Sequence, residues 1–277
     1  MASAANKTVL DRATDLLMNF GEVLAVGLSG SRARNAADAY SDFDLVVFMP
    51  EEVPPEKHRR KCYHDAGFDD LPYFDIHCEA GVDDALMIDK YRCQIVWMSL
   101  PCVESYLEAL NTDFDCDEFL PGGILQTVPL LDPDHVIDQL KSDVPPYCRA
   151  RSEQRLKNHL RDAHASIYGQ GWLEKAVQRG DYFSFRKHLD HMLDHFIICV
   201  FALNRTWYCE EKRLVTVLDD FELVPAHAGQ RLNALLMHTG ENADLSASLD
   251  DLKELFMELA ALAQHHYPDV RFPLDWA

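Results

Sequence analysis

The chain has 277 residues, of which 48% are hydrophobic and 26% charged, with a formal net charge of −20. This composition excludes a disordered chain, and the acidic excess disfavours duplex nucleic acid, whose binding depends on Lys and Arg that neutralise phosphates. No stretch approaches the ~20 apolar residues that span a bilayer, and the N-terminus has no apolar signal core. We therefore expect a cytoplasmic protein that does not contact a membrane.

Hydrophobic patterning predicts a mixed α/β region in the first half of the chain. Apolar residues three and four apart predict a helix over Lys7–Asn19 and another from Pro101 to about Leu110. Short apolar or alternating runs predict strands over Glu22–Leu28, Asp42–Met49, Tyr73–Cys78, Cys93–Leu100 and Val128–Leu131.

After Val144-Pro145-Pro146 the pattern becomes helical throughout. Helices are predicted over Arg149–Ser166, Trp172–Arg179, Asp181–Trp207, Ala226–Met237 and Ser246–His266. We expect an α+β protein of two domains, a mixed-sheet domain at 1–145 and an all-helical bundle at 146–277.

The segment GSRARNAADAYSDFDL carries the first candidate site. Gly30-Ser31 closes the first predicted strand, and a Gly-Ser turn leaves backbone amides open to a phosphate. Asp42 and Asp44 lie two apart on the next strand, so the alternation of side chains directs both carboxylates to one face. Paired carboxylates repel each other unless a cation shares them, and Mg²⁺ prefers such oxygen ligands.

A third carboxylate is expected to complete this site. Asp75, in the predicted strand YFDIHC, is the first candidate, either as a metal ligand or as the base that deprotonates an attacking hydroxyl. Glu79 is the alternative, and Asp190 or Asp194 in the helical half could also supply the base.

These motifs resemble the signature of the polymerase-beta-like nucleotidyltransferase superfamily, over about residues 20–80. The layout is similar to that of aminoglycoside and lincosamide nucleotidyltransferases, in which a helical bundle follows the catalytic domain. The resemblance implies Mg²⁺ held by Asp42, Asp44 and Asp75. It also implies a nucleoside triphosphate, most simply ATP, held by Gly30 and Ser31. Arg32, with Arg34 beside it, and Lys212 in the bundle are further candidates for phosphate contacts.

The resemblance implies transfer of a nucleoside monophosphate, AMP from ATP, to a hydroxyl of a small antibiotic-like molecule, with release of pyrophosphate. The acidic charge favours a cationic acceptor. Two alternatives stay open, a protein-modifying adenylyltransferase of the antitoxin type and a non-catalytic nucleotide-binding module. We expect a monomer or a homodimer.

Overall fold

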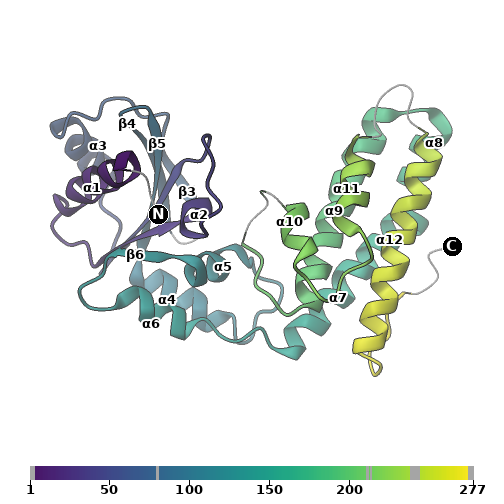
Figure 1. Cartoon of the computed structure of the whole chain (residues 1–277). Coiled ribbons are helices and arrows are strands. Elements are labelled where there is room, and N and C mark those ends of the chain that lie inside the picture. Colours follow the sequence, from purple (N-terminus) through teal and green to yellow (C-terminus); the bar gives the residue numbers. More distant parts are fainter. Residues whose placement is uncertain (1–3, 79–80, 210–211, 213, 238–243, 274–277) are drawn as a thin grey trace. The chain divides into compact units, whose positions relative to one another are not determined.

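The structure is a computed structural model that describes residues 4–78, 81–209, 212, 214–237 and 244–273. The chain forms two compact units, one of Met1–Asp113 with Phe119–Pro145 and one of Phe114–Glu118 with Pro146–Ala277. A mixed sheet with helices in the first half and a largely helical second half confirm the predicted α+β class (Figure 1). Among the described residues, no helix is both long and apolar enough to cross a bilayer.

The first unit is built on a six-stranded sheet in the order β3-β4-β5-β2-β1-β6. Its strands are β1 (Ala25–Ser29), β2 (Phe43–Met49), β3 (Tyr73–Cys78), β4 (Gly81–Ile88), β5 (Tyr91–Ser99) and β6 (Val128–Leu131). β2 and β5 are parallel, and the other neighbours are antiparallel. β4 was not predicted, because its adjacent Asp83 and Asp84 interrupt the apolar pattern.

One face of the sheet packs against α1 (Ala4–Met18) and α3 (Glu56–Asp65) (Figure 1). The side chains of Leu45 on β2 and Ile95 on β5 lie side by side in this core. We call it the core face. Residues one position away along each strand point to the other face, since side chains alternate along a strand.

Helices cover only part of the second face. α5 (Phe119–Gln126) and α6 (Val136–Asp143) contact β1, and α4 (Leu100–Ala109) contacts β5. At Gly27 of β1 an added Cβ would lie 2.2 Å from Cγ2 of Thr127, so this cover sits directly on the strand. We call this second side the open face, because its polar row, described below, is only partly buried.

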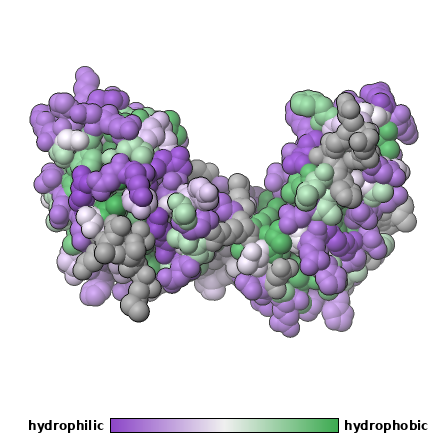
Figure 2. All heavy atoms as spheres, turned by 45° about the horizontal axis from the view of Figure 1, so that its top comes forward, coloured by the Kyte–Doolittle hydropathy of each residue, from purple (hydrophilic) through white to green (hydrophobic). Residues whose placement is uncertain are grey.

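The second unit is helical. It contains α7 (Arg149–His164), a π-helical turn at Ala165–Gly169, α8 (Trp172–Arg179), α9 (Tyr182–Leu203), α10 (Leu214–Asp219), α11 (Ala228–Met237) and α12 (Leu245–His266). The helix predicted over Asp181–Trp207 ends earlier, at Leu203. The chain leaves the helix at Arg205, whose φ is +49°, and the side-chain amide of Asn204 donates to the carbonyl of Val200 at 2.8 Å. On the face drawn in Figure 2, hydrophilic residues are the most frequent among those coloured.

The segment Phe114–Glu118 is held in the helical unit by a buried ionic cluster. Glu118 is 2% exposed, and its Oε1 accepts a hydrogen bond from the hydroxyl of Tyr147 at 2.9 Å. The same oxygen lies 3.3 Å from Nε of Arg155 and 3.9 Å from Nη1 of Arg151, both arginines being buried. Burial raises the pKa of Glu118, and the two arginines oppose that rise.

Candidate functional site

Asp42 and Asp44 lie at the start of β2, on the open face of the sheet. In the register Asp44 stands between Ser29 of β1 and Gln94 of β5. Asp42 precedes the strand, and its Oδ2 accepts hydrogen bonds from Arg92 of β5. The hydrogen bond to Asp42 raises the pKa of Arg92, and the charge of Asp44 adds to that rise. The negative charges of Asp42 and Asp44 therefore both favour the protonated guanidinium of Arg92.

Gly30 fits against the carboxylate of Asp44. Its φ is +63°, in the left-handed region that glycine adopts without strain, and a Cβ at this position would lie 1.9 Å from Oδ2 of Asp44. Gly30 and Ser31 begin α2 (Gly30–Ala33), directly after β1. The turn at Gly30 thus packs directly against the Asp44 carboxylate, and only glycine, which has no side chain, permits this contact.

Gly30→Ala is expected to abolish the nucleotide transfer that the sequence resemblance implies, while the helical unit stays folded. The new methyl group must displace the Asp44 carboxylate or reshape the turn, and the positive φ adds strain. Gly67→Ala is the matched control, because Gly67 also has a positive φ (+81°) but no atom lies within 4 Å of its Cβ position. Transfer rates and circular dichroism of both variants test this. Equal activity of both variants would contradict the close fit.

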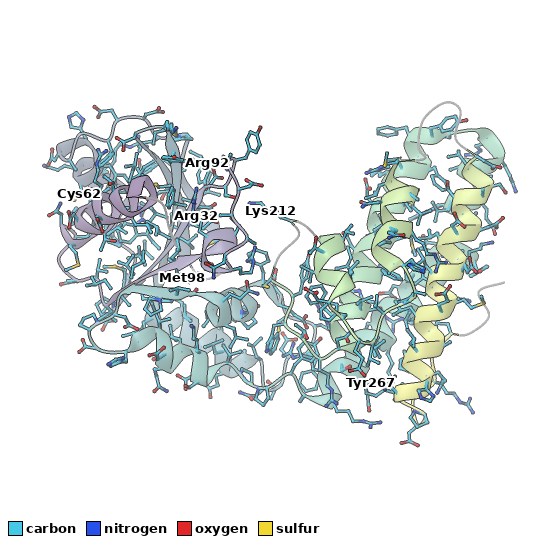
Figure 3. The ribbon with its side chains drawn as sticks, viewed as in Figure 1. Arg32, Cys62, Arg92, Met98, Lys212 and Tyr267 are labelled. Carbon is cyan, nitrogen blue, oxygen red and sulfur yellow. The ribbon has the colours of Figure 1, made fainter. Side chains whose placement is uncertain are left out.

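Arg32 holds the loop that leads into β2. Its Nε donates to the carbonyl of Asp42 at 2.8 Å, its Nη2 donates to the carbonyl of Ser41 at 2.7 Å, and the guanidinium lies over the ring of Phe43. Figure 3 labels it. Arg34 donates to Oε1 of Gln126 at 2.8 Å. The contacts of Arg32 are those of a residue that positions Asp42, and its predicted phosphate contact stays a prediction.

Asp75 is not brought together with Asp42 and Asp44. A bulge between Tyr73 and Ile76 interrupts the alternation of side chains along β3, and Asp75 itself has a φ of +60°. Its Oδ1 accepts a hydrogen bond from Nη2 of Arg59 at 2.6 Å, and its backbone N–H donates to Oδ1 of Asp84 at 2.9 Å. Arg59 and Asp84 belong to the core face, so Asp75 is directed to the side opposite the Asp42/Asp44 pair.

The reason for this orientation is a buried ionic network on the core face. Arg59 of α3 donates from Nε to Oδ2 of Asp84 at 2.9 Å, and both side chains are almost fully buried. Tyr63 and Trp97 also donate to Oδ2 of Asp84. Arg59 needs carboxylate partners because a buried charge is costly without them, and Asp75 supplies a second one.

Asp83 of β4 is a further carboxylate on the open face, beside Gln94 of β5. It accepts a hydrogen bond from Nε2 of Gln94 at 2.7 Å and from the hydroxyl of Tyr73 at 3.3 Å. Burial raises the pKa of Asp83 to about 6, against the lowering effect of these hydrogen bonds, and the charge of Asp44 adds to the rise. Sequence reasoning missed Asp83 because β4 was not predicted. The apolar residues Val82, Leu86 and Ile88, which fall on one side of an alternation, were the available signal for this strand.

The other sequence candidates lie elsewhere. Glu79 is outside the residues that the structure describes. Lys212 is an exposed residue of the helical unit, between α9 and α10, and its contact with a triphosphate stays a prediction (Figure 3). Asp190 pairs with Nε of Arg186 one helical turn earlier at 2.9 Å, and Asp194 lies exposed on the same helix.

The donor set of the open face fits a divalent cation at Asp42 and Asp44. Both side chains offer hard carboxylate oxygens on one face, and Gly30, which has no Cβ, leaves room for the Asp44 carboxylate. Asp42 is 21% exposed and therefore accessible. Within the described part of the chain, no three His, Cys, Asp or Glu side chains are grouped to hold a metal. Two protein ligands would suit Mg²⁺, since this ion keeps waters and substrate phosphates as its other ligands.

Residues 13–79, which include Gly30, Asp42 and Asp44, match the sequence profile of the family described as Nucleotidyltransferase domain. A solved structure, the crystal structure of a nucleotidyltransferase-like protein from Exiguobacterium sibiricum 255-15, is similar over 94% of this chain and 77% of that chain. The identity is 11% and the TM-score 0.43. No curated protein sequence matches the chain. The family match indicates nucleotide transfer as the class of activity and does not specify the substrate.

Proposed function

We propose that the protein transfers a nucleoside monophosphate, AMP from ATP, to a hydroxyl group of a small cationic molecule of the aminoglycoside or lincosamide kind. The observation that carries this proposal is the fit of Gly30 against the Asp44 carboxylate, with Asp42 on the same face. It lies within the segment that matches a nucleotidyltransferase domain. The formal charge of −20 supports a cationic acceptor, which the field of the protein would attract.

In this proposal each residue of the open face has a separate task. Asp42 and Asp44 hold Mg²⁺, which supplies positive charge to the triphosphate when it is bound. The turn at Gly30 and Ser31 receives the β- and γ-phosphates. Asp83 accepts the proton of the acceptor hydroxyl, since a carboxylate with a pKa of about 6 is largely ionised at neutral pH and still basic enough for this task.

The reaction balances without a further reactant. The acceptor oxygen forms a bond to the α-phosphorus, and the bond from that phosphorus to the bridging oxygen breaks. Pyrophosphate leaves with the electron pair, and the hydroxyl proton passes to Asp83. In-line displacement of this kind depends mainly on positioning and charge stabilisation, so the open face needs no covalent nucleophile.

The test is incubation with each labelled nucleoside triphosphate, Mg²⁺ and a panel of aminoglycosides and lincosamides, with pyrophosphate release and product mass as readouts. We expect transfer that requires Mg²⁺ and is lost in the Asp42→Asn/Asp44→Asn double variant, which keeps the shape of both side chains. Mg²⁺ should also raise the Tm of the nucleotide complex of the wild type and not that of the double variant.

The outcomes separate the function classes. Nucleotide binding without transfer to any acceptor would favour a non-catalytic module. Labelling of protein in place of small molecules would favour a protein-modifying enzyme. A double variant that responds to Mg²⁺ and nucleotide as the wild type does would contradict the assignment of Asp42 and Asp44.

A further inference from the structure

The contact between Arg92 and Asp42 places a positive charge where the proposed cation would bind. Nε of Arg92 donates to Oδ2 of Asp42 at 3.0 Å, and Nη2 donates to the same oxygen. Arg92 lies on β5 next to Cys93, which pairs with Phe43 of β2, so the two charged side chains come from neighbouring positions of adjacent strands. Figure 3 labels Arg92. The guanidinium of Arg92 and a metal ion would compete for Oδ2 of Asp42.

The ion pair between Arg92 and Asp42 is exposed enough for a cation to replace the guanidinium. The side chain of Arg92 is 46% exposed and that of Asp42 is 21% exposed. Solvent weakens such pairs, in contrast with the almost completely buried pair of Arg59 and Asp84 on the core face. A divalent cation carries twice the charge of the guanidinium and prefers carboxylate oxygens as ligands, so it competes with Arg92 for Oδ2 of Asp42.

The neighbouring arginines have other partners. Arg32 donates to the backbone carbonyls of Ser41 and Asp42, and Arg34 donates to Gln126. Arg92 differs, because its partner is a carboxylate that the cation would take. Once displaced, a partly exposed guanidinium beside this site is placed to meet phosphate oxygens, for which its planar donor set is suited.

We infer that Arg92 exchanges partners during the reaction cycle. It neutralises Asp42 before the cation binds, and it then hydrogen-bonds to the triphosphate that arrives with the cation. This inference rests on the proposed function, and it deepens it by assigning a positioning residue that couples the binding of cation and nucleotide. The exchange of partners predicts that replacing Arg92 has two effects of opposite sign, tighter binding of the cation and weaker binding of the nucleotide.

The test measures both affinities without measuring transfer. Mn²⁺ binding to the nucleotide-free protein is followed by electron paramagnetic resonance, and binding of Mg²⁺ with a non-hydrolysable ATP analogue by calorimetry. Arg92→Gln is expected to bind Mn²⁺ about threefold more tightly, because the competing charge is removed. It is expected to bind the nucleotide about tenfold more weakly, because a charge-assisted hydrogen bond is lost.

Lys90→Gln is the matched control. Lys90 lies between β4 and β5, two residues from Arg92, and its ammonium group lies over the ring of Tyr91. The control removes the same charge from the same part of the chain, so it reports the general electrostatic effect. It should leave both affinities near those of the wild type.

The result that overturns the inference is an Arg92→Gln variant whose Mn²⁺ affinity is unchanged or lower, or whose nucleotide affinity is unchanged. An equal effect of Lys90→Gln would overturn it as well. Asp42→Asn distinguishes this failure from failure of the proposed function. If that variant binds Mn²⁺ as tightly as the wild type, the cation assignment itself is wrong. If it loses Mn²⁺ and Arg92→Gln does not gain, only the exchange of partners is wrong.

Discussion

Asp83→Asn is expected to reduce the single-turnover transfer rate by about 10²-fold or more, the scale for loss of a general base. Asparagine keeps the size of the side chain and can still hydrogen-bond to Tyr73 and Gln94, so folding should change little. What the variant lacks is the proton acceptor on the face that carries Asp42 and Asp44.

The pH profile gives this prediction a second readout. Because burial raises the pKa of Asp83 to about 6, the wild-type rate should fall as the pH drops through about 6, where the carboxylate becomes protonated and can no longer accept a proton. The variant has no such group at this position and should lose this limb of the profile.

Asp75→Asn is the companion variant. Its carboxylate faces Arg59 on the core side, so we expect a rate near that of the wild type, with some loss of stability. A collapse of the rate in Asp75→Asn with near-normal turnover in Asp83→Asn would return the base to Asp75. Near-normal rates in both would direct the search to Asp190 or Asp194 in the helical unit.

Arg59→Met is expected to destabilise the first unit by about 3–5 kcal/mol, the cost of removing one partner of a buried ion pair. The substitution fills a similar volume but leaves Asp84 buried at 0% side-chain exposure without its counter-ion. Tyr63 and Trp97 still donate to that carboxylate, and they cannot neutralise it. The measurement is the free energy of unfolding from denaturant titration.

Two further variants make the result specific. Lys57→Met removes an exposed positive charge from the same helix and should change the stability by no more than about 0.5 kcal/mol. Adding Asp84→Asn to Arg59→Met removes the uncompensated charge and should restore part of the loss. If Arg59→Met and Lys57→Met cost the same, the ionic network does not support the sheet as described.

The part of the site that could be predicted from the sequence is the part that is local in the chain. Gly30 directly follows β1, Asp42 and Asp44 lie at the start of the next strand, β2, and strand alternation alone places the two carboxylates on one side. The helical half was also predictable, since apolar residues at helical spacing line up along α9 from Phe185 to Leu203, all of them buried at the stripe positions.

The remainder depends on contacts that are distant in the chain. Asp75 lies on the expected strand, β3. It nevertheless points to the core face, because of a bulge in that strand and a hydrogen bond from Arg59, 16 residues away. The adjacent Asp83 and Asp84 of β4 point to opposite faces of the sheet. Asp84 is buried against Arg59, and Asp83 accepts a hydrogen bond from Gln94. The partner of Asp42 is 50 residues away. No periodicity in the sequence reports which carboxylate a buried arginine will take.

The position of Phe114–Glu118 bears on how the chain could be divided or recombined. The backbone passes between the two units after residues 113, 118 and 145, so a single cut at 145 separates Glu118 from Arg151 and Arg155. A fragment that starts at Pro146 would bury the guanidinium groups of Arg151 and Arg155 without the Glu118 carboxylate, and removing one member of a buried ionic cluster is costly. Exchange of the helical part between related chains would therefore succeed only when this five-residue insert travels with it. Each unit is compact by itself, but a single cut in the chain does not separate one unit from the other.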